Sequence, residues 1–320
     1  MNLRLIDFPE PATLDDYELA IQHVIRLLNK QTGLIAVLQF GNVSAPGISD
    51  IDLLAVFQNH ASCQINPLEI LNERYRKLFT HNVDAITENH LNDFFTFTLL
   101  DRFRIIAGDL KWKQKLPEGD DLKMLKRQIA AEYLVANYID LAMQHAYRVI
   151  RVRNLLQHLK GLKSDFEYID IKNPLLDACI DELIDWRNNW FNNAQPSNKQ
   201  LSQWFCNFYL NFKEFTEQFI SDHPLYLPAN SRIKLSSRIQ WRPSDHLSAV
   251  RTGIRLPSRW IRNKVFYKRN QRLNSWKLFI PSVSHTRHEL LRTRYAFFES
   301  LHASNKVSFP YFHTFSTGIT

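Results

Sequence analysis

Cysteine and long apolar runs are scarce in this chain of 320 residues, and each scarcity excludes a class of protein. The three cysteines are odd in number, lie far apart and form no CxxC motif, so neither a disulfide framework nor a zinc site is indicated. No stretch approaches the roughly 20 apolar residues that a membrane-spanning helix needs. The N-terminal residues also lack the apolar run of a signal peptide. We therefore expect a cytoplasmic protein without a transmembrane segment.

Glycine is scarce as well, which gives weight to the places where it occurs. Only 8 residues are glycine, well below the usual ~7% of a globular chain. Two of them, Gly41 and Gly47, flank a single loop. Glycine permits backbone conformations and close approaches that a side chain would obstruct, so this loop is a candidate for ligand contact.

Acidic residues are almost missing from the C-terminal part of the chain. The net charge of the whole sequence is +8, yet residues 230–320 hold 17 Lys and Arg against 3 acidic residues, a net charge of +14. The preceding 229 residues carry a net charge of −6. Such asymmetry predicts different partners for the two parts. The sequence favours contact between residues 230–320 and a polyanion.

The most basic stretch, residues 259–272, has several interpretations. Its sequence RWIRNKVFYKRNQR contains no acid and interleaves cations with Trp260, Phe266 and Tyr267. Cationic grooves with stacking aromatics suit single-stranded nucleic acid. Basic surfaces with aromatics also suit anionic membrane lipid. Docking on an acidic protein surface, and a solvated basic surface over core aromatics, are the other two readings that composition leaves open.

The first third of the chain alternates helical and strand patterns. Thr13 is the predicted N-cap of a helix that begins at Leu14, because its hydroxyl can accept a backbone hydrogen bond. Apolar spacings of two residues, or of three to four, predict the other elements. These are strands at 33–40, 49–54, 82–86 and 104–107, and helices at 67–79 and 91–100. The alternation predicts a mixed sheet with flanking helices.

The alternation of helical and strand patterns ends at about residue 115. A linker-like run at 116–121 precedes long helical patterns, which predict an all-α helical bundle. These patterns cover residues 122–162, 174–192 and 198–220. The predicted fold class is α+β, with a sheet domain at 1–115, a helical bundle at 116–229, and a basic C-terminal region at 230–320 whose elements the pattern does not define.

The segment 38–57, LQFGNVSAPGISDIDLLAVF, is the most informative part of the sequence. It predicts a strand, a glycine turn and a second strand that carries Asp50 and Asp52. Successive side chains of a strand face opposite sides, so the two carboxylates should point the same way while Ile51 faces a core. Aspartate is disfavoured inside strands, and a pair of them requires a reason. Two fixed carboxylates suit Mg²⁺, which usually takes one or two protein carboxylates plus substrate phosphates.

This segment resembles the signature of the nucleotidyltransferase superfamily typified by DNA polymerase beta, nearest in style to its minimal and aminoglycoside nucleotidyltransferases. The matching residues are the strand 38–40, the turn Gly41-Asn42 and the acidic strand 49–54. The resemblance spans roughly residues 15–108. It implies a third carboxylate on a neighbouring strand, for which Asp84 is the candidate, and a last core strand that ends at Gly108.

The resemblance also implies roles for the motif residues. Catalysis and Mg²⁺ binding fall to Asp50, Asp52 and Asp84, and nucleotide binding falls to Gly41, Asn42, Ser44 and Ser49. The implied enzyme transfers a nucleoside monophosphate from a nucleoside triphosphate, such as ATP, to an acceptor hydroxyl and releases pyrophosphate. The acceptor stays open between a small molecule, a protein and an RNA end.

A non-catalytic protein on the same fold, acting as a regulatory or nucleic-acid-binding module, is the alternative. Asn42 stands where the family usually has Ser or Gly, and the loop at 43–49 is a little short. A further acid, Glu132, lies where antibiotic-modifying relatives place a base in their helical domain. No local motif supports that role, and we expect Glu132 to be a surface acid on a helix.

Overall fold

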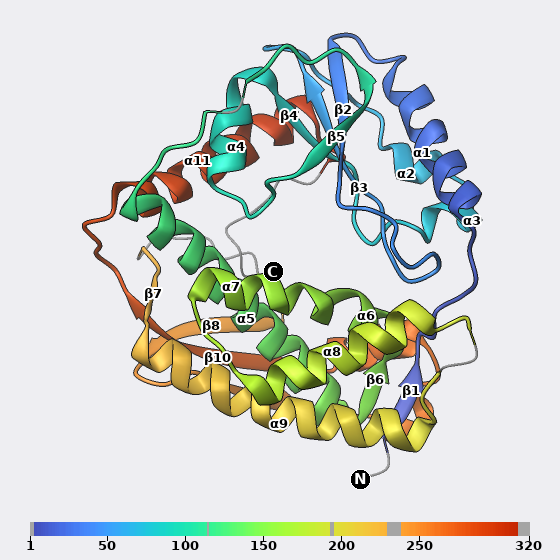
Figure 1. The fold of residues 1–320 in the computed structure, drawn as a ribbon, viewed down its shortest axis with the longest axis vertical. Helices are drawn as coiled ribbons and strands as arrows, with labels where there is room; N and C mark the ends of the chain where they lie inside the picture. Colours follow the sequence, from blue (N-terminus) through green and yellow to red (C-terminus); the bar gives the residue numbers. More distant parts are fainter. Residues whose placement is uncertain (1–2, 114, 193–194, 229–237, 313–320) are drawn as a thin grey trace. The chain divides into compact units, whose positions relative to one another are not determined.

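The structure, a computed structural model, describes residues 3–113, 115–192, 195–228 and 238–312 (Figure 1). The protein is of the α+β class, and its described residues form three mixed or parallel sheets interleaved with helices. Two compact units contain them. The sheet unit consists of the described residues of Glu10–Lys126 and His288–Thr317, and the helical unit of those of Met1–Pro9 and Arg127–Arg287. None of the described helices is long and apolar enough to cross a membrane.

The sheet unit is built on four strands in the order β4-β3-β2-β5. Their bounds are β2 (Leu34–Phe40), β3 (Asp52–Phe57), β4 (Asp84–Thr87) and β5 (Phe103–Gly108). The central strand β2 is antiparallel to both β3 and β5, whereas β4 runs parallel to β3. The prediction of a mixed sheet in the first third of the chain is therefore confirmed.

Helix α1 (Leu14–Leu28) packs on one face of this sheet (Figure 1). The predicted N-cap is confirmed, because Thr13 and Asp16 form a reciprocal capping box. Buried residues of α1 share a core with one residue of β2 and with alternate residues of β3, which face the same side of the sheet. The set comprises Tyr17, Ala20, Val24 and Leu28 with Val37, Leu53, Ala55 and Phe57.

The prediction of one helix over 67–79 is wrong. Two short helices, α2 (Pro67–Ile70) and α3 (Glu73–Arg76), are separated by Leu71, whose backbone is extended. The side chains of Asn66 and Asn72 accept hydrogen bonds from Leu68 N and Tyr75 N and so cap each helix separately. A second asparagine cap inside an apolar pattern restarts the helix, because it competes for the backbone donors.

The last described helix belongs to the sheet unit. Helix α11 (Glu289–Ser308) lies next to the end of helix α4 (Leu91–Thr96). The Phe297 ring of α11 lies 5.2 Å from the ring of Phe97, which follows α4. Asn305 donates a hydrogen bond to the carbonyl of Ala85 on β4. The predicted third range, 230–320, is thus divided between the two units.

Five α-helices follow one another in the described part of the helical unit. They are α5 (Asp120–Tyr147), α6 (Val152–His158), α7 (Leu162–Ile169), α8 (Pro174–Asn189) and α9 (Asn198–Asp222), with α5 beginning in the sheet unit. The patterns at 174–192 and 198–220 are confirmed as helices. The helix predicted over 122–162 is interrupted at Arg148, which has a φ of 55°. Strand β6 (Val149–Arg151) follows and pairs in parallel with β1 (Arg4–Ile6).

Further strands follow the helices in the same unit. They are β7 (Leu225–Tyr226), β8 (Ile239–Ser244), β9 (Ser248–Gly253) and β10 (Asn274–Val283), and α10 (Lys264–Arg272) lies between the last two. Strand β10 pairs with each of the other three. The predicted all-α range 116–229 is therefore not purely helical, since it contains β6 and β7.

Asp165, on α7, is a buried carboxyl group in the helical unit, and burial raises its pKa to about 7. An unfolded Asp titrates near pH ~3.9, so between about pH 4 and 7 the folded state binds more protons and stability falls as pH rises. We expect Asp165→Asn to remove this component, which is at most about 1.4 kcal/mol per pH unit. Urea unfolding across this window should find the variant the more stable protein at neutral pH; parallel curves would contradict the prediction.

Candidate active site

The loop between β2 and β3 is held by a tyrosine from α1. The buried Tyr17 hydroxyl donates to the carbonyl oxygen of Ser49 at 2.6 Å and accepts from the amide of Gly47 at 3.1 Å. The Ser49 hydroxyl oxygen accepts from the amide of Ala45 at 3.2 Å. These bonds satisfy buried backbone groups that a loop would otherwise leave unpaired. The loop is therefore fixed at the point where it enters β3.

Tyr17→Phe tests this arrangement because it removes only the hydroxyl oxygen. The Gly47 amide and the Ser49 carbonyl each lose a partner, which should cost about 1–3 kcal/mol in the free energy of unfolding. Tyr75→Phe is the matched control, since among the described residues the Tyr75 hydroxyl has no hydrogen-bond partner. Urea unfolding of the two variants measures the difference, and equal losses would mean that the hydroxyl does not hold the loop.

Asp50 and Asp52 meet at the end of this loop. Asp52 is the first residue of β3, but Asp50 precedes the strand, so the expectation that both lie on it is wrong. They still face the same way, because the intervening Ile51 is buried and its amide donates to the carbonyl of Leu78. One oxygen of each carboxylate and one ring nitrogen of His81 lie within 4.8 Å of one another. The two carboxylates are therefore brought together because Ile51 between them is anchored in the core, not because both aspartates pair within the sheet.

Two neighbouring side chains contact the aspartates. The Thr80 hydroxyl donates to Asp50 Oδ2 at 2.7 Å. His81 Nε2 lies 2.7 Å from Asp52 Oδ1, while its Nδ1 lies 2.7 Å from the carbonyl oxygen of Asn82. Both ring nitrogens thus face acceptors, which only the doubly protonated imidazolium can satisfy. Burial opposes this charge, but the bond to Asp52 and the charge of Asp84 raise the pKa of His81 to about 10.

Asp84 lies close to this group but outside it. It is the first residue of β4, is buried, and pairs in register with Leu54 of β3. Leu54 is two residues from Asp52, so Asp84 and Asp52 share one face of the sheet. The negative charge of its carboxylate helps to raise the pKa of the His81 imidazole. The structure thus places Asp84 beside the pair, while the third group of the described cluster is His81.

The predicted nucleotide-binding residues fall into two sets. Gly41, Asn42 and Ser44 are exposed in the turn after β2, and Gly41 has a φ of 62°. An ideal Cβ on Gly41 would find no atom within 4 Å, so the turn opens toward solvent. Ser49 is buried and bonded within the loop, where it supports the turn.

Sequence reasoning missed His81 and misjudged Glu132. His81 carries no local motif, and only the pairing of β4 with β3 brings it to Asp52. The expectation that Glu132 is a surface acid is wrong, because this residue of α5 is 1% exposed. Its Oε1 accepts from Gln128 Nε2 at 2.8 Å, and the same amide nitrogen lies 3.2 Å from the carbonyl of Tyr226. A buried acid without a local motif leaves no signal in a single sequence.

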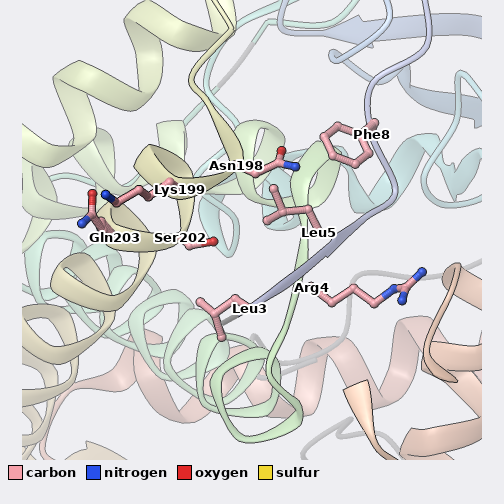
Figure 2. A pocket seen from close by; sticks show the side chains of 8 residues that line it. All are labelled: Leu3, Arg4, Leu5, Phe8, Asn198, Lys199, Ser202 and Gln203. Carbon is pink, nitrogen blue, oxygen red and sulfur yellow. The ribbon is translucent and has the colours of Figure 1, made fainter. Parts of the chain in front are cut away.

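The helical unit has a pocket of its own, with a volume of about 630 Å³. Residues of β1 and its flanks, and residues in the first turns of α9, line it (Figure 2). None of the predicted site residues is among them. The Arg4 side chain extends away from the α9 residues in Figure 2, and its Nη1 donates to the carbonyl of Arg259.

Comparison of the chain with known protein families, curated proteins and solved structures found no match.

Proposed function

We propose that this protein is a Mg²⁺-dependent nucleotidyltransferase and that the sheet unit is its nucleotidyltransferase-like catalytic domain. The observation that carries the proposal is the convergence of Asp50 and Asp52, whose carboxylate oxygens lie within 4.8 Å of each other. Carboxylates this close repel each other. Ile51 and the tyrosine-held loop nevertheless hold them together, and a bound cation would offset their repulsion.

The residues fit Mg²⁺ through their oxygens. Thr80 and His81 contact Oδ2 of Asp50 and Oδ1 of Asp52, so each carboxylate retains a second oxygen to offer to a cation. Carboxylate oxygens are the donors that Mg²⁺ prefers, whereas an imidazole nitrogen is not. We therefore assign Asp50 and Asp52 as ligands and His81 as a neighbour that orients Asp52. When bound, the metal would neutralise charge on the triphosphate.

The turn after β2 supplies the nucleotide contacts in this proposal. Backbone amides of a glycine turn in the left-handed region form a concave anion site. The amides and short side chains of Gly41, Asn42 and Ser44 would hold the phosphates there. The acceptor hydroxyl oxygen then forms a bond to the α-phosphorus, the bond to the β-phosphate oxygen breaks, and pyrophosphate leaves. Asp84, on the same sheet face as Asp52, would take up the hydroxyl proton. The acceptor is a small molecule, a protein or an RNA end.

One observation favours the alternative of a non-catalytic regulatory protein. The His81 imidazolium is an internal cation that already pairs with Asp52. If that pair persists, the positive charge that a metal would bring is supplied by the protein itself. The two proposals differ in the behaviour of the wild-type protein, because only the enzyme should bind Mg²⁺ or Mn²⁺ at this group.

The test is label transfer. The protein is incubated with each nucleoside triphosphate labelled at the α-phosphate, with Mg²⁺ and with cell extract as a source of acceptors. Transfer of label to a small molecule, protein or RNA that depends on Asp50 and Asp52 would support the enzyme. Absence of transfer with every nucleotide, together with absence of metal binding by calorimetry, would favour the non-catalytic protein.

A further inference from the structure

The segment that joins β9 to β10, residues 254–273, is strongly basic. We call it the β9–β10 insertion. It contains seven Lys and Arg, all exposed, and no acidic residue. Arg151 of β6 and Arg153 of α6 lie near it: partial burial lowers the pKa of Lys264, and the charges of these two and of Lys268 lower it further against the opposing effect of Asp7. The insertion itself contains no acid to match its cations, which suits it to an anionic partner.

The insertion also exposes large apolar side chains. Ile254 is 73% exposed, Val265 57%, Trp260 52% and Leu273 48%. Each of them directly precedes or follows an exposed Lys or Arg in the sequence. The amide of Ile254 donates to the carbonyl of Leu273 at 3.1 Å, so two of the four lie side by side. Exposed apolar groups of this size, each bordered by a cation, suit an interaction surface.

The backbone of the insertion is fixed, so these exposures are built into the fold. Asn270 Oδ1 accepts from the amide of Leu256 at 2.8 Å, and Asn274 Nδ2 donates to the carbonyl of Ile254 at 3.0 Å. Both asparagines are buried, as are the anchoring side chains of Ile261 and Tyr267. The Asn263 side chain caps α10 by accepting from the amides of Val265 and Phe266.

The distribution of aromatic rings decides which polyanion fits. Tyr267 and Trp276 are buried, and the guanidinium of Arg269 lies over the Phe266 ring at 5.4 Å. Trp260 is therefore left as the exposed ring of the insertion on which a base could stack. Single-stranded nucleic acid binds along successive stacking rings. Three of the four exposed apolar groups are instead aliphatic, and aliphatic groups with flanking cations suit the headgroup region of a bilayer.

We propose that the β9–β10 insertion docks the protein on the surface of an anionic phospholipid membrane. The seven cations contact lipid phosphates, and Ile254, Trp260, Val265 and Leu273 enter the headgroup–acyl boundary. This inference does not depend on the nucleotidyltransferase proposal, because it uses other residues in the other unit.

Sedimentation with vesicles tests the proposal. Wild-type protein should bind phosphatidylcholine vesicles that contain phosphatidylglycerol, bind pure phosphatidylcholine weakly, and release as salt rises. Lys268→Ala/Arg272→Ala should weaken binding about 30-fold, because each cation near an anionic surface contributes a similar share. Trp260→Ser/Leu273→Ser should weaken it at least about tenfold through lost insertion.

Matched variants control for net charge and for exposed apolar area. Lys111→Ala/Lys123→Ala removes two exposed cations of the sheet unit, and Leu175→Ser/Leu210→Ser removes two leucines that are 55% and 58% exposed. Neither pair should change vesicle binding, and all variants should melt near the wild-type temperature. Unchanged vesicle binding by the Trp260→Ser/Leu273→Ser variant would overturn the proposal. So would absence of vesicle binding, with or without tight binding of a single-stranded oligonucleotide.

Discussion

Replacing Asp50 and Asp52 together by Asn is expected to lower nucleotidyl transfer about 10³-fold, because metal stabilisation of transition-state charge contributes several kcal/mol and each ~1.4 kcal/mol is tenfold in rate. The substitution keeps the shape of both side chains and an acceptor oxygen for the Thr80 hydroxyl, which donates to Asp50 at 2.7 Å. It removes the charges that would bind the cation. Initial rates of label transfer measure the effect once an acceptor has been found.

The same variant should fold as well as the wild type, which separates loss of activity from loss of structure. The pair of His81 with Asp52 is about two-fifths exposed on both sides, so its loss costs about 0–1 kcal/mol. Removal of the repulsion between the two carboxylates acts in the opposite direction. Thermal unfolding should therefore change little.

Asp109→Asn/Asp120→Asn is the control for net charge, since both side chains lie on the surface of the same unit. It should transfer label at the wild-type rate. Equal activity of the wild type and the Asp50/Asp52 variant would exclude this group as the catalytic centre. A variant that loses both activity and cooperative unfolding would show instead that the aspartates hold the loop.

The sequence predicted those parts of the fold in which one local signal dominates. Helix α1 has its cap at Thr13, and α9 has a clear start after Ser197, so both begin where their patterns indicate. Periodicity failed where a backbone turn carries no composition signal. Arg148 adopts a left-handed conformation without being glycine, and the helical pattern continues across it.

The candidate site divides in the same way. The spacing of Asp50 and Asp52 around an apolar residue is local, and it predicted their convergence even though only Asp52 belongs to β3. His81 reaches Asp52 through the loop before β4, a neighbour relation created by tertiary pairing. Glu132 is buried beside Gln128, whose side-chain amide also bonds to the carbonyl of the distant Tyr226. The helical pattern around Glu132 gave no indication of this. Pairwise contacts between distant segments leave no trace in the periodicity of either segment.

The largest loss of stability is expected from Gly108→Ala at the end of β5. Gly108 has a φ of 79°, and an added Cβ would lie 2.0 Å from the carbonyl oxygen of Ile35 and 2.8 Å from Ala36 Cα on β2. The left-handed conformation costs an alanine about 1–2 kcal/mol, and forcing the strands apart adds about 1–3 kcal/mol. We therefore expect a total loss of about 2–5 kcal/mol in the free energy of unfolding.

Gly41→Ala isolates the steric part of that loss. Gly41 has a φ of 62°, similar to that of Gly108, but an added Cβ would meet no atom within 4 Å. It should therefore lose only the conformational share of about 1–2 kcal/mol. Urea unfolding of the two variants yields the difference, which measures the contact between β5 and β2 directly. Equal losses would mean that β5 does not pair with β2 in the register that places Gly108 opposite Ala36.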